Sequence, residues 1–322
     1  MRPFERLFRN PHVATITANF WPREYDFSPY PMERRLIQTD ADTQVLVQTQ
    51  HPAGEPVGEV VLLHGLEGGG DAGYCISTAF HALQRGFVAH RFHMRTCGGT
   101  ESLCKTLYHA GLTSDLRVFL ERNAAEGRQL PVFLVGYSLG GNVGLKLAGE
   151  LGDTDLIAGV CAISTPIDLG ASAKRIGDPV NFIYERRFVK RMKKRLLATG
   201  RFAPETLAPL RSIFDIDDKI TAPSFGFRNA EHYYATQSAK VFLRDIRIPT
   251  LLVQARDDSY IPFEIFSDPA IAANPMIELL VTEHGGHLGF LAKSGQRFWM
   301  VDVALDFAEK VVASRVSASS SR

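Results

Sequence analysis

The chain has 322 residues, of which 45% are hydrophobic and 22% are charged, and these globular values exclude disordered, fibrous and multi-span membrane classes. Its 36 Lys and Arg residues nearly balance its 35 Asp and Glu residues, so no net field favours a nucleic-acid partner. Four cysteines without a C-x-x-C pair and an N-terminus without an apolar signal-peptide run predict free thiols and a cytoplasmic protein.

The first part of the chain, residues 1–56, differs from the rest. Prolines recur at positions 3, 11, 22, 29 and 31, before a run at 43–49 in which apolar and polar residues alternate. Alternation of this kind is typical of a strand with one buried face. We therefore predict an N-terminal extension that includes an antiparallel edge strand.

From residue 57 onward, short β-branched runs alternate with amphipathic stretches. Near-continuous apolar runs are expected for strands of a parallel sheet that helices cover on both faces. This alternation predicts an α/β fold with a mostly parallel central sheet. The expected strands are 60–63, 87–92, 132–135, 157–163, 250–253 and 277–281, and the expected helices include 115–126, 142–151 and 298–313.

The alternation stops over residues 166–238, which contain short helical or irregular pieces and no convincing strand. We predict that this segment is a helical cap, inserted over the C-terminal edge of a core formed by 57–165 and 239–315. The last residues, 316–322, are mostly serine and lack core-forming side chains. We expect a disordered tail there.

A Gly-x-Ser-x-Gly motif at 136–140 directly follows the expected strand at 132–135 and precedes an expected helix. In this context the motif is typical of a nucleophile elbow, in which the serine lies on a strained turn and the flanking glycines avoid clashes. We predict that Ser138 is the nucleophile. A glycine-rich turn without chemistry is the alternative, and the strand and helix on either side of the motif disfavour it.

A serine nucleophile needs a general base, and elbow enzymes order their triad along the chain as serine, acid and histidine. The histidines that follow Ser138 are His232, His284 and His287. Two glycines directly precede His287, at the end of an apolar strand, whereas His284 lies before this turn. The turn favours His287 as the base.

The acid is expected after the preceding strand, where Asp257 and Asp258 are adjacent. We choose Asp258, four residues before Pro262, because the intervening turn can direct its carboxylate to the histidine. Asp257 is then a turn or capping residue. Asp168 is a third candidate, since it follows the strand at 157–163 and could approach the same site from a neighbouring strand.

The oxyanion of an acyl-transfer reaction needs two backbone N–H donors. One candidate is Leu139, the residue after the nucleophile, at the positive end of the following helix. The other is Leu66, within the glycine-rich loop 64–70 that follows another expected strand. A phosphate-binding loop is the alternative for these glycines, but neither of its usual spacings occurs there.

Together these motifs resemble the α/β-hydrolase superfamily. Their combination resembles its YheT-like branch, which is related to abhydrolase-domain lipases and medium-chain ethyl ester synthases. The resemblance spans residues 10–290, nearly the whole chain. The segments that carry it are 10–16, 64–68, 108–111 with Asp115, 136–142, 166–169, 233–234 and 284–290.

The resemblance implies the roles of nucleophile, acid and base for Ser138, Asp258 and His287. It implies a serine esterase or lipase acting on small-molecule esters with short to medium acyl chains, without metal or cofactor. An acyl-alcohol transferase or a thioesterase with the same triad is the alternative. The chain departs from the branch at Thr96, where relatives often have glycine.

The cap contains a basic segment at 174–201, with ten Lys or Arg residues. Apolar residues at 188, 192 and 196 predict an amphipathic helix whose basic face, within 186–195, points to solvent. A lid that touches anionic membranes is the alternative. The residues that we expect to bind substrate are Tyr137, next to the nucleophile, and Tyr233 and Tyr234 of the cap.

Two further hypotheses concern other classes of site and protein. His90, His93 and His109 could be argued into a metal site, but the spacing of the first two points them to opposite faces of a strand. Structural roles are therefore favoured for them. A catalytically silent, lipid-surface binding protein with the same fold is the alternative to an enzyme.

Overall fold

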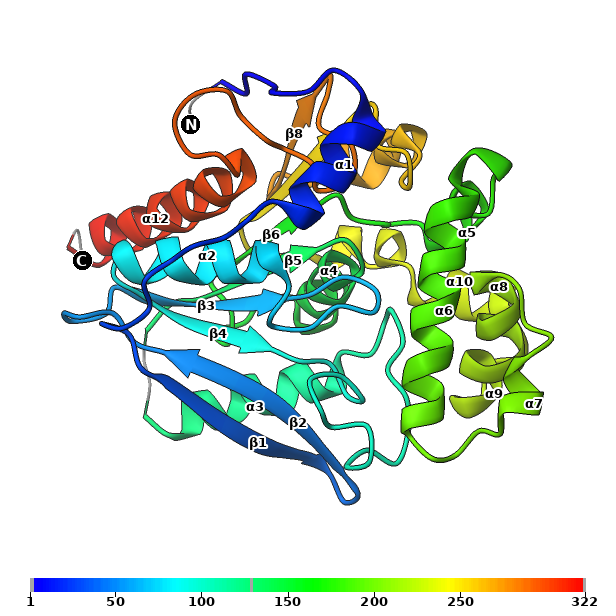
Figure 1. Cartoon of the computed structure of the whole chain (residues 1–322). Coiled ribbons are helices and arrows are strands. Elements are labelled where there is room, and N and C mark those ends of the chain that lie inside the picture. Colours follow the sequence, from blue (N-terminus) through cyan, green and yellow to red (C-terminus); the bar gives the residue numbers. More distant parts are fainter. Residues whose placement is uncertain (1–2, 128–129, 321–322) are drawn as a thin grey trace.

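The computed structural model describes residues 3–127 and 130–320. Its centre is an eight-stranded sheet in the order β1-β2-β4-β3-β5-β6-β7-β8 (Figure 1). β2 pairs antiparallel with both of its neighbours, β1 and β4. All other neighbouring strands, from β4 to β8 in this order, pair parallel. The strands are β1 Met32–Asp40, β2 Thr43–Gln50, β3 Gly58–Leu63, β4 Phe87–Phe92, β5 Val132–Tyr137, β6 Gly159–Ile163, β7 Thr250–Ala255 and β8 Ile277–Thr282.

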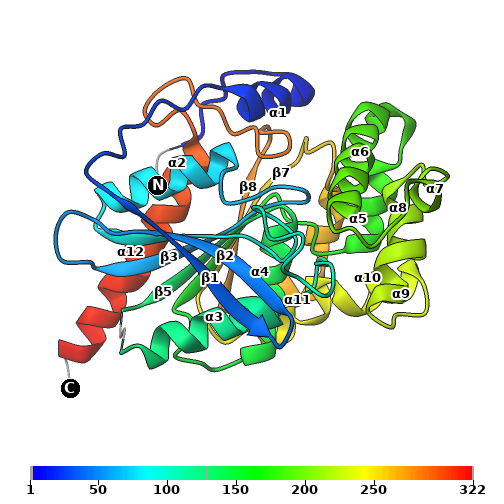
Figure 2. The same cartoon turned by 60° about the horizontal axis from the view of Figure 1, so that its bottom comes forward.

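Helices cover both faces of this sheet. Outside the segment between β6 and β7 they are α1 Pro11–Phe20, α2 Gly73–Gln84, α3 Ser114–Ala125, α4 Leu139–Leu151, α11 Pro269–Ala273 and α12 Trp299–Ser320. α2 and α12 pack on one face, and α3 and α4 on the other (Figures 1 and 2). Val60 and Leu62 of β3 enter one hydrophobic core, and Val61 and Leu63 enter the other. Burial on both faces explains the continuous apolar runs of these strands.

The residues between β6 and β7 form a group of helices that we call the cap helices. They lie beside the ends of the sheet to which β3 and β4 point (Figure 1). Residues 166–238, all of which the structure describes, contain no strand. The cap helices are α5 Leu169–Ile176, α6 Phe182–Ala198, α7 Pro204–Leu207, α8 Ile213–Ile216, α9 Ala222–Ser224 and α10 Ala230–Gln237, with a π-helical turn at Asp217–Thr221. Short 3-10 helices lie at Pro179–Asn181, Ala239–Val241, Leu243–Asp245 and Phe263–Ser267.

The N-terminal part contains more regular structure than the sequence predicted. The strand expected at 43–49 is β2, but it is not the edge, because β1 pairs with it antiparallel on its outer side. The helix α1 was also not expected. The side chain of Asn10 caps it by accepting the N–H groups of His12 and Val13, and Pro11 occupies its first turn, which is where proline is favoured.

The C-terminal tail also differs from the prediction. α12 continues to Ser320, so the expectation of a disordered tail at 316–322 is wrong as far as that residue, and the last two positions lie outside the described residues. No glycine or proline occurs from Trp299 to Ser320, so the sequence contains no signal that would end the helix earlier. In the part of the chain that the structure describes, no helix has the length and apolar character needed to cross a bilayer.

Candidate active site

The turn between β5 and α4 has the geometry of a nucleophile elbow. Ser138 has φ of +52° and ψ of −122°, a left-handed conformation that strains a residue with a side chain. Glycines permit the close backbone contacts around it. A Cβ at Gly136 would lie 2.5 Å from Gly141 Cα, and a Cβ at Gly140 would lie 2.2 Å from the carbonyl oxygen of Leu63. The strained turn therefore depends on the two motif glycines.

Ser138 begins a chain of side-chain hydrogen bonds. Its Oγ lies 3.0 Å from Nε2 of His287, and Nδ1 of His287 lies 3.0 Å from Oδ2 of Asp258. The buried Asp258 carboxylate also accepts the backbone N–H groups of Tyr260, at 2.8 Å, and Ile261, at 3.1 Å, on Oδ1. These two bonds fix the carboxylate toward the imidazole. The structure thus brings together the three residues that the sequence indicated as nucleophile, base and acid.

The two alternative acids lie in other hydrogen-bond networks. Asp257 Oδ2 is 3.0 Å from Nδ1 of His284, so it shapes the turn that precedes His287. Asp168 accepts a backbone N–H at the start of α5 and forms an ion pair with Lys240. Among the described residues, neither carboxylate forms a hydrogen bond with His287. Asp258 is therefore the acid that the geometry favours.

The loop that carries His287 is held from two sides. Its imidazole stacks on the Tyr260 ring with 4.2 Å between the centroids, and its backbone N–H donates to Thr15 Oγ at 2.9 Å. Thr15 belongs to α1, which packs so closely that a Cβ at Gly286 would lie 2.5 Å from the Pro11 carbonyl oxygen. The sequence did not reveal the role of Thr15, because no local pattern shows that a residue of α1 contacts the loop of His287, 272 residues further along the chain.

The loop after β3 fixes the direction of one proposed oxyanion donor. Burial lowers the pKa of His64 to about 3, so its ring is neutral. Its Nε2 accepts the N–H of Met94 at 3.1 Å, so Nδ1 carries the proton and donates to the carbonyl of Gly65 at 2.8 Å. That carbonyl and the N–H of Leu66 belong to one trans peptide, so they point in opposite directions. His64 therefore orients the Leu66 N–H.

Both proposed donors are available beside the nucleophile. The N–H of Leu66 has no hydrogen-bond partner among the described residues. Leu139 is the first residue of α4, where the N–H groups of the first turn have no acceptor within the helix. A Cβ at Gly65 would lie only 3.2 Å from Ser138 Cβ, which shows how closely the loop approaches the serine. This arrangement can stabilise negative charge on an oxygen next to Ser138.

A buried ion pair connects this loop to α6 of the cap helices. Arg195 lies 2.8 Å from Glu67 Oε1, and their side chains are 9% and 4% exposed. The guanidinium also lies over the Tyr108 ring, 4.6 Å from its centroid. Burial alone would lower the pKa of Arg195, but its interactions with Glu67, Tyr108 and Cys97 together outweigh burial and raise the pKa above its usual value. Glu67 directly follows Leu66, so the ion pair anchors the proposed oxyanion loop.

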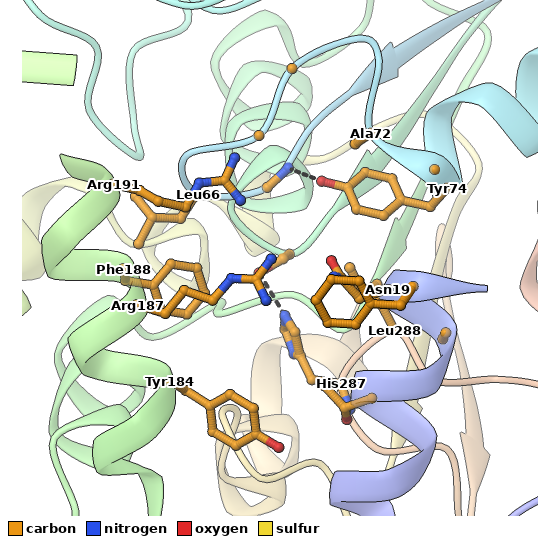
Figure 3. A pocket seen from close by; sticks show the side chains of 18 of the residues that line it. Asn19, Leu66, Ala72, Tyr74, Tyr184, Arg187, Phe188, Arg191, His287 and Leu288 are labelled. Atoms are coloured by element: carbon orange, nitrogen blue, oxygen red, sulfur yellow. Dashed lines mark hydrogen bonds between the residues drawn. The ribbon is translucent and has the colours of Figure 1, made fainter. Parts of the chain in front are cut away.

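The basic face of α6 does not point wholly to solvent, and in this respect the sequence prediction is wrong. Arg187, Arg191 and Arg195 are spaced by four residues and share one helix face, which turns toward the site. Arg187 and Arg191 extend from α6 into a cavity beside Ser138 (Figure 3), and Arg191 donates to the Glu67 main-chain carbonyl. Arginine suits this face because its long stem packs while its guanidinium finds oxygen acceptors.

Two cavities meet at the nucleophile. The larger has a volume of about 460 Å³ and is lined by Ser138 and His287. The smaller has about 90 Å³ and is lined by Ser138, Leu139 and mainly apolar residues of the cap helices. Phe188 and Tyr260 contact both cavities, so they lie between them. A substrate that reaches Ser138 can therefore place two different groups in two different environments.

The three predicted substrate-binding tyrosines fall in two places. Tyr233 and Tyr234 line the smaller cavity, where the Tyr234 hydroxyl donates to Asp217 at 2.7 Å. Burial raises the pKa of Asp217 to about 6, although hydrogen bonds to its carboxylate act in the other direction. Tyr137 lines neither cavity. Its side chain is fully buried in the core and its hydroxyl pairs with Thr78, because alternate residues of β5 point to opposite faces.

The histidines considered as metal ligands take part in packing. His90 contacts Glu59 at 2.8 Å, His93 contacts Gln48 at 3.1 Å, and His109 packs against aromatic rings. Within residues 3–127 and 130–320, no group of three or more His, Cys, Asp or Glu is arranged to hold a metal ion.

The strand order, the strained serine turn and the hydrogen-bonded Ser-His-Asp arrangement together define an α/β hydrolase. The chain belongs to the alpha/beta hydrolase family, whose sequence model matches residues 60–299. The predictions of this fold and of a hydrolase are therefore confirmed.

Comparisons with individual proteins agree with this family. The chain is 32% identical over 294 residues to the "Putative esterase YheT" of Escherichia coli, and this alignment covers 89% of this chain and 86% of that protein. It is 29% identical to the monoacylglycerol lipase of Saccharomyces cerevisiae, over 74% of this chain and 56% of the lipase. The esterase Pf2001 of Pyrococcus furiosus superposes with a TM-score of 0.59 at 16% identity, covering 89% of this chain and 96% of the esterase. This last likeness concerns the fold.

Proposed function

We propose that the protein is a serine esterase that hydrolyses carboxylic esters with short to medium acyl chains. The observation that carries this proposal is the chain of hydrogen bonds from Ser138 through His287 to Asp258, at the junction of two cavities. The relatives named as an esterase and as a monoacylglycerol lipase support the same type of reaction.

The first half of the reaction forms an acyl-enzyme. Ser138 Oγ attacks the ester carbonyl carbon while His287 Nε2 takes the serine proton, and Asp258 orients the ring and stabilises the imidazolium. The N–H groups of Leu66 and Leu139 bind the developing oxyanion. The bond between the carbonyl carbon and the alcohol oxygen then breaks, and His287 gives its proton to that oxygen.

The second half releases the acid. A water molecule gives a proton to His287 and attacks the acyl carbon, the bond to Ser138 Oγ breaks, and the proton returns to Ser138. An alcohol in place of water would give acyl transfer, and a thioester would enter by the same steps, so both remain alternatives within this mechanism. A silent lipid-binding protein would not need the aligned hydrogen bonds.

The position of the base indicates which part of the ester each cavity would hold. His287 lines the larger cavity but not the smaller one, and the leaving alcohol must receive its proton from this residue. The alcohol part therefore occupies the larger cavity, and the acyl chain occupies the smaller, more apolar one. The smaller cavity has a volume of about 90 Å³, several times the roughly 10–15 Å³ that one water requires. This volume gives room for a short to medium acyl chain.

An ester panel tests the proposal. We expect wild-type protein to hydrolyse p-nitrophenyl acetate, butyrate and octanoate with higher kcat/KM than the palmitate, because a long chain exceeds the smaller cavity. A fluorophosphonate probe should label Ser138. A folded protein that neither reacts with the probe nor hydrolyses any ester would support the lipid-binding alternative instead.

We further propose that the enzyme works in the cytoplasm. The described cysteines Cys75, Cys97, Cys104 and Cys161 are free and buried, as expected for a reducing compartment. The exposed Lys190 and Lys194 of α6 are available for peripheral contact with an anionic membrane.

The ion pair between Arg195 and Glu67 should act on both stability and catalysis. We expect Arg195→Met to lower the free energy of unfolding by about 3–5 kcal/mol, because it leaves the Glu67 carboxylate buried without its cation. It should also lower kcat more than it raises KM, since the loop that holds Leu66 loses its anchor. Thermal unfolding and butyrate-ester kinetics measure the two effects.

The exposed Lys194, on the same helix, provides the matched control. Lys194→Met should leave both the stability and kcat close to those of the wild type. Arg195→Lys keeps the charge and should recover part of kcat. Wild-type kcat in a folded Arg195→Met protein would show that the ion pair does not position the loop.

A further inference from the structure

The larger cavity carries an excess of positive charge. Arg23, Arg187 and Arg191 are among the residues that line it. Among the described residues of its wall, the only carboxylate is that of Asp71, which is 65% exposed and already lies 3.0 Å from Arg91. Three cations therefore face one carboxylate that has another partner.

None of these three arginines forms an ion pair with any residue that the structure describes. Arg23 donates to two main-chain carbonyls and to a serine hydroxyl. Arg191 donates to the main-chain carbonyl of Glu67. Arg187 lies over the Phe20 ring, 5.3 Å from its centroid, and no oxygen acceptor of the described chain reaches its guanidinium. Its five N–H donors are thus available to a ligand.

The start of α2 adds to this charge from the opposite wall. Ala72, Gly73 and Tyr74 line the cavity, and no side chain caps the first turn of the helix. The free N–H groups and the positive end of the helix dipole favour an anion at such a position. Burial lowers the pKa of Arg23, as expected for a partly desolvated cation without a carboxylate beside it.

We propose that the larger cavity binds an anionic group, a carboxylate or a phosphate, on the alcohol part of the ester. The proposal rests on the proposed esterase function, because the proton path from His287 assigns the alcohol to this cavity. Arg187 is the principal ligand, and it extends from α6 toward His287 (Figure 3). The substrate class is then a short- to medium-chain acyl ester of a small anionic alcohol.

The size and the geometry of the cavity agree with this class. A volume of about 460 Å³ lies within the usual range for a small organic ligand. The planar guanidinium of Arg187 can bind two oxygens of a carboxylate or of a phosphate at once. Arg191 lies one helical turn further along α6, next to Leu66 (Figure 3), so the charged face of α6 extends from the base to the oxyanion loop.

The test compares soluble esters that share one acyl chain. The substrates are para-carboxyphenyl butyrate, para-(phosphonooxy)phenyl butyrate and the neutral para-carbamoylphenyl butyrate. We expect the wild type to show a higher kcat/KM for at least one anionic ester than for the neutral ester. Arg187→Gln should lower the ratio of kcat/KM for the anionic ester to kcat/KM for the neutral ester about tenfold or more, because a hydrogen bond to a charged group is lost. The two anionic esters distinguish carboxylate from phosphate as the recognised group.

The matched control is Lys190→Gln, which removes a cation from the same helix at an exposed position that lines neither cavity. It should leave the ratio of anionic to neutral turnover unchanged. A wild-type ratio near one for both anionic esters would overturn the proposal. An Arg187→Gln ratio equal to that of the wild type would do the same.

Binding gives a readout that does not depend on turnover. By calorimetry, para-hydroxybenzoate or para-hydroxyphenyl phosphate should bind the wild type more tightly than neutral para-hydroxybenzamide, and Arg187→Gln should remove the difference. Equal affinities for all three compounds in the wild type would overturn the anion site. Turnover of the neutral ester without anionic preference overturns the anion site alone, whereas the absence of both turnover and fluorophosphonate labelling overturns the esterase proposal.

Discussion

Ser138→Ala should abolish ester hydrolysis, by about 10⁶-fold in kcat if the triad acts as a unit, and should leave the fold intact. Alanine keeps the Cβ, so the backbone strain at φ of +52° is unchanged. The lost hydroxyl contacts His287 and lies where two cavities meet, so its removal leaves no void in the core. Hydrolysis of p-nitrophenyl butyrate and the midpoint of thermal unfolding measure the two parts of this expectation.

An exposed serine of the cap helices serves as the control for Ser138. Ser224→Ala, in α9, should retain both butyrate hydrolysis and reaction with the fluorophosphonate probe. The Ser138→Ala protein should show neither. Hydrolysis near the wild-type rate by a folded Ser138→Ala protein would contradict the assignment of the nucleophile.

The parallel core of the fold could be predicted because burial on both faces leaves a simple pattern. β3 consists of Gly58–Leu63, all buried, and its apolar run is visible without any tertiary information. β1 has no such pattern. Its sequence includes Arg34 and Arg35, and most of it is exposed or partly exposed, since an edge strand that faces water can carry almost any side chain. Only the pairing with β2 reveals that strand.

The catalytic candidates could be predicted for a related reason. The elbow and the glycine turn before His287 are local structures, and each needs particular residues at fixed spacing. The positioning residues have no local signature. Arg195 and Glu67 are far apart in the chain, and helical periodicity shows that Arg187, Arg191 and Arg195 share a face without showing what that face contacts.

Asp258→Asn should lower kcat by about 10⁴-fold, as substitution of the acid does in other triads. The amide oxygen can still accept the N–H groups of Tyr260 and Ile261, which hold Oδ1 in place. The amide nitrogen, however, would point a donor at Nδ1 of His287, where the carboxylate accepts. The imidazole must then carry its proton on Nε2, and in that tautomer it cannot take the proton of Ser138. Steady-state kinetics near neutral pH, together with thermal unfolding, measures this loss.

Asp257→Asn is the matched comparison, since it makes the same chemical change one residue earlier. Asp257 contacts His284 and the N–H of Gly286, so its loss loosens the turn without placing a donor against the catalytic imidazole. We expect a decrease in kcat of about tenfold or less, the scale of one neutral hydrogen bond. If Asp257→Asn has the larger effect, the assignment of the acid is wrong. If both variants keep wild-type kcat, neither Asp257 nor Asp258 orients the His287 imidazole, and the proposal that Asp258 fixes its tautomer is wrong.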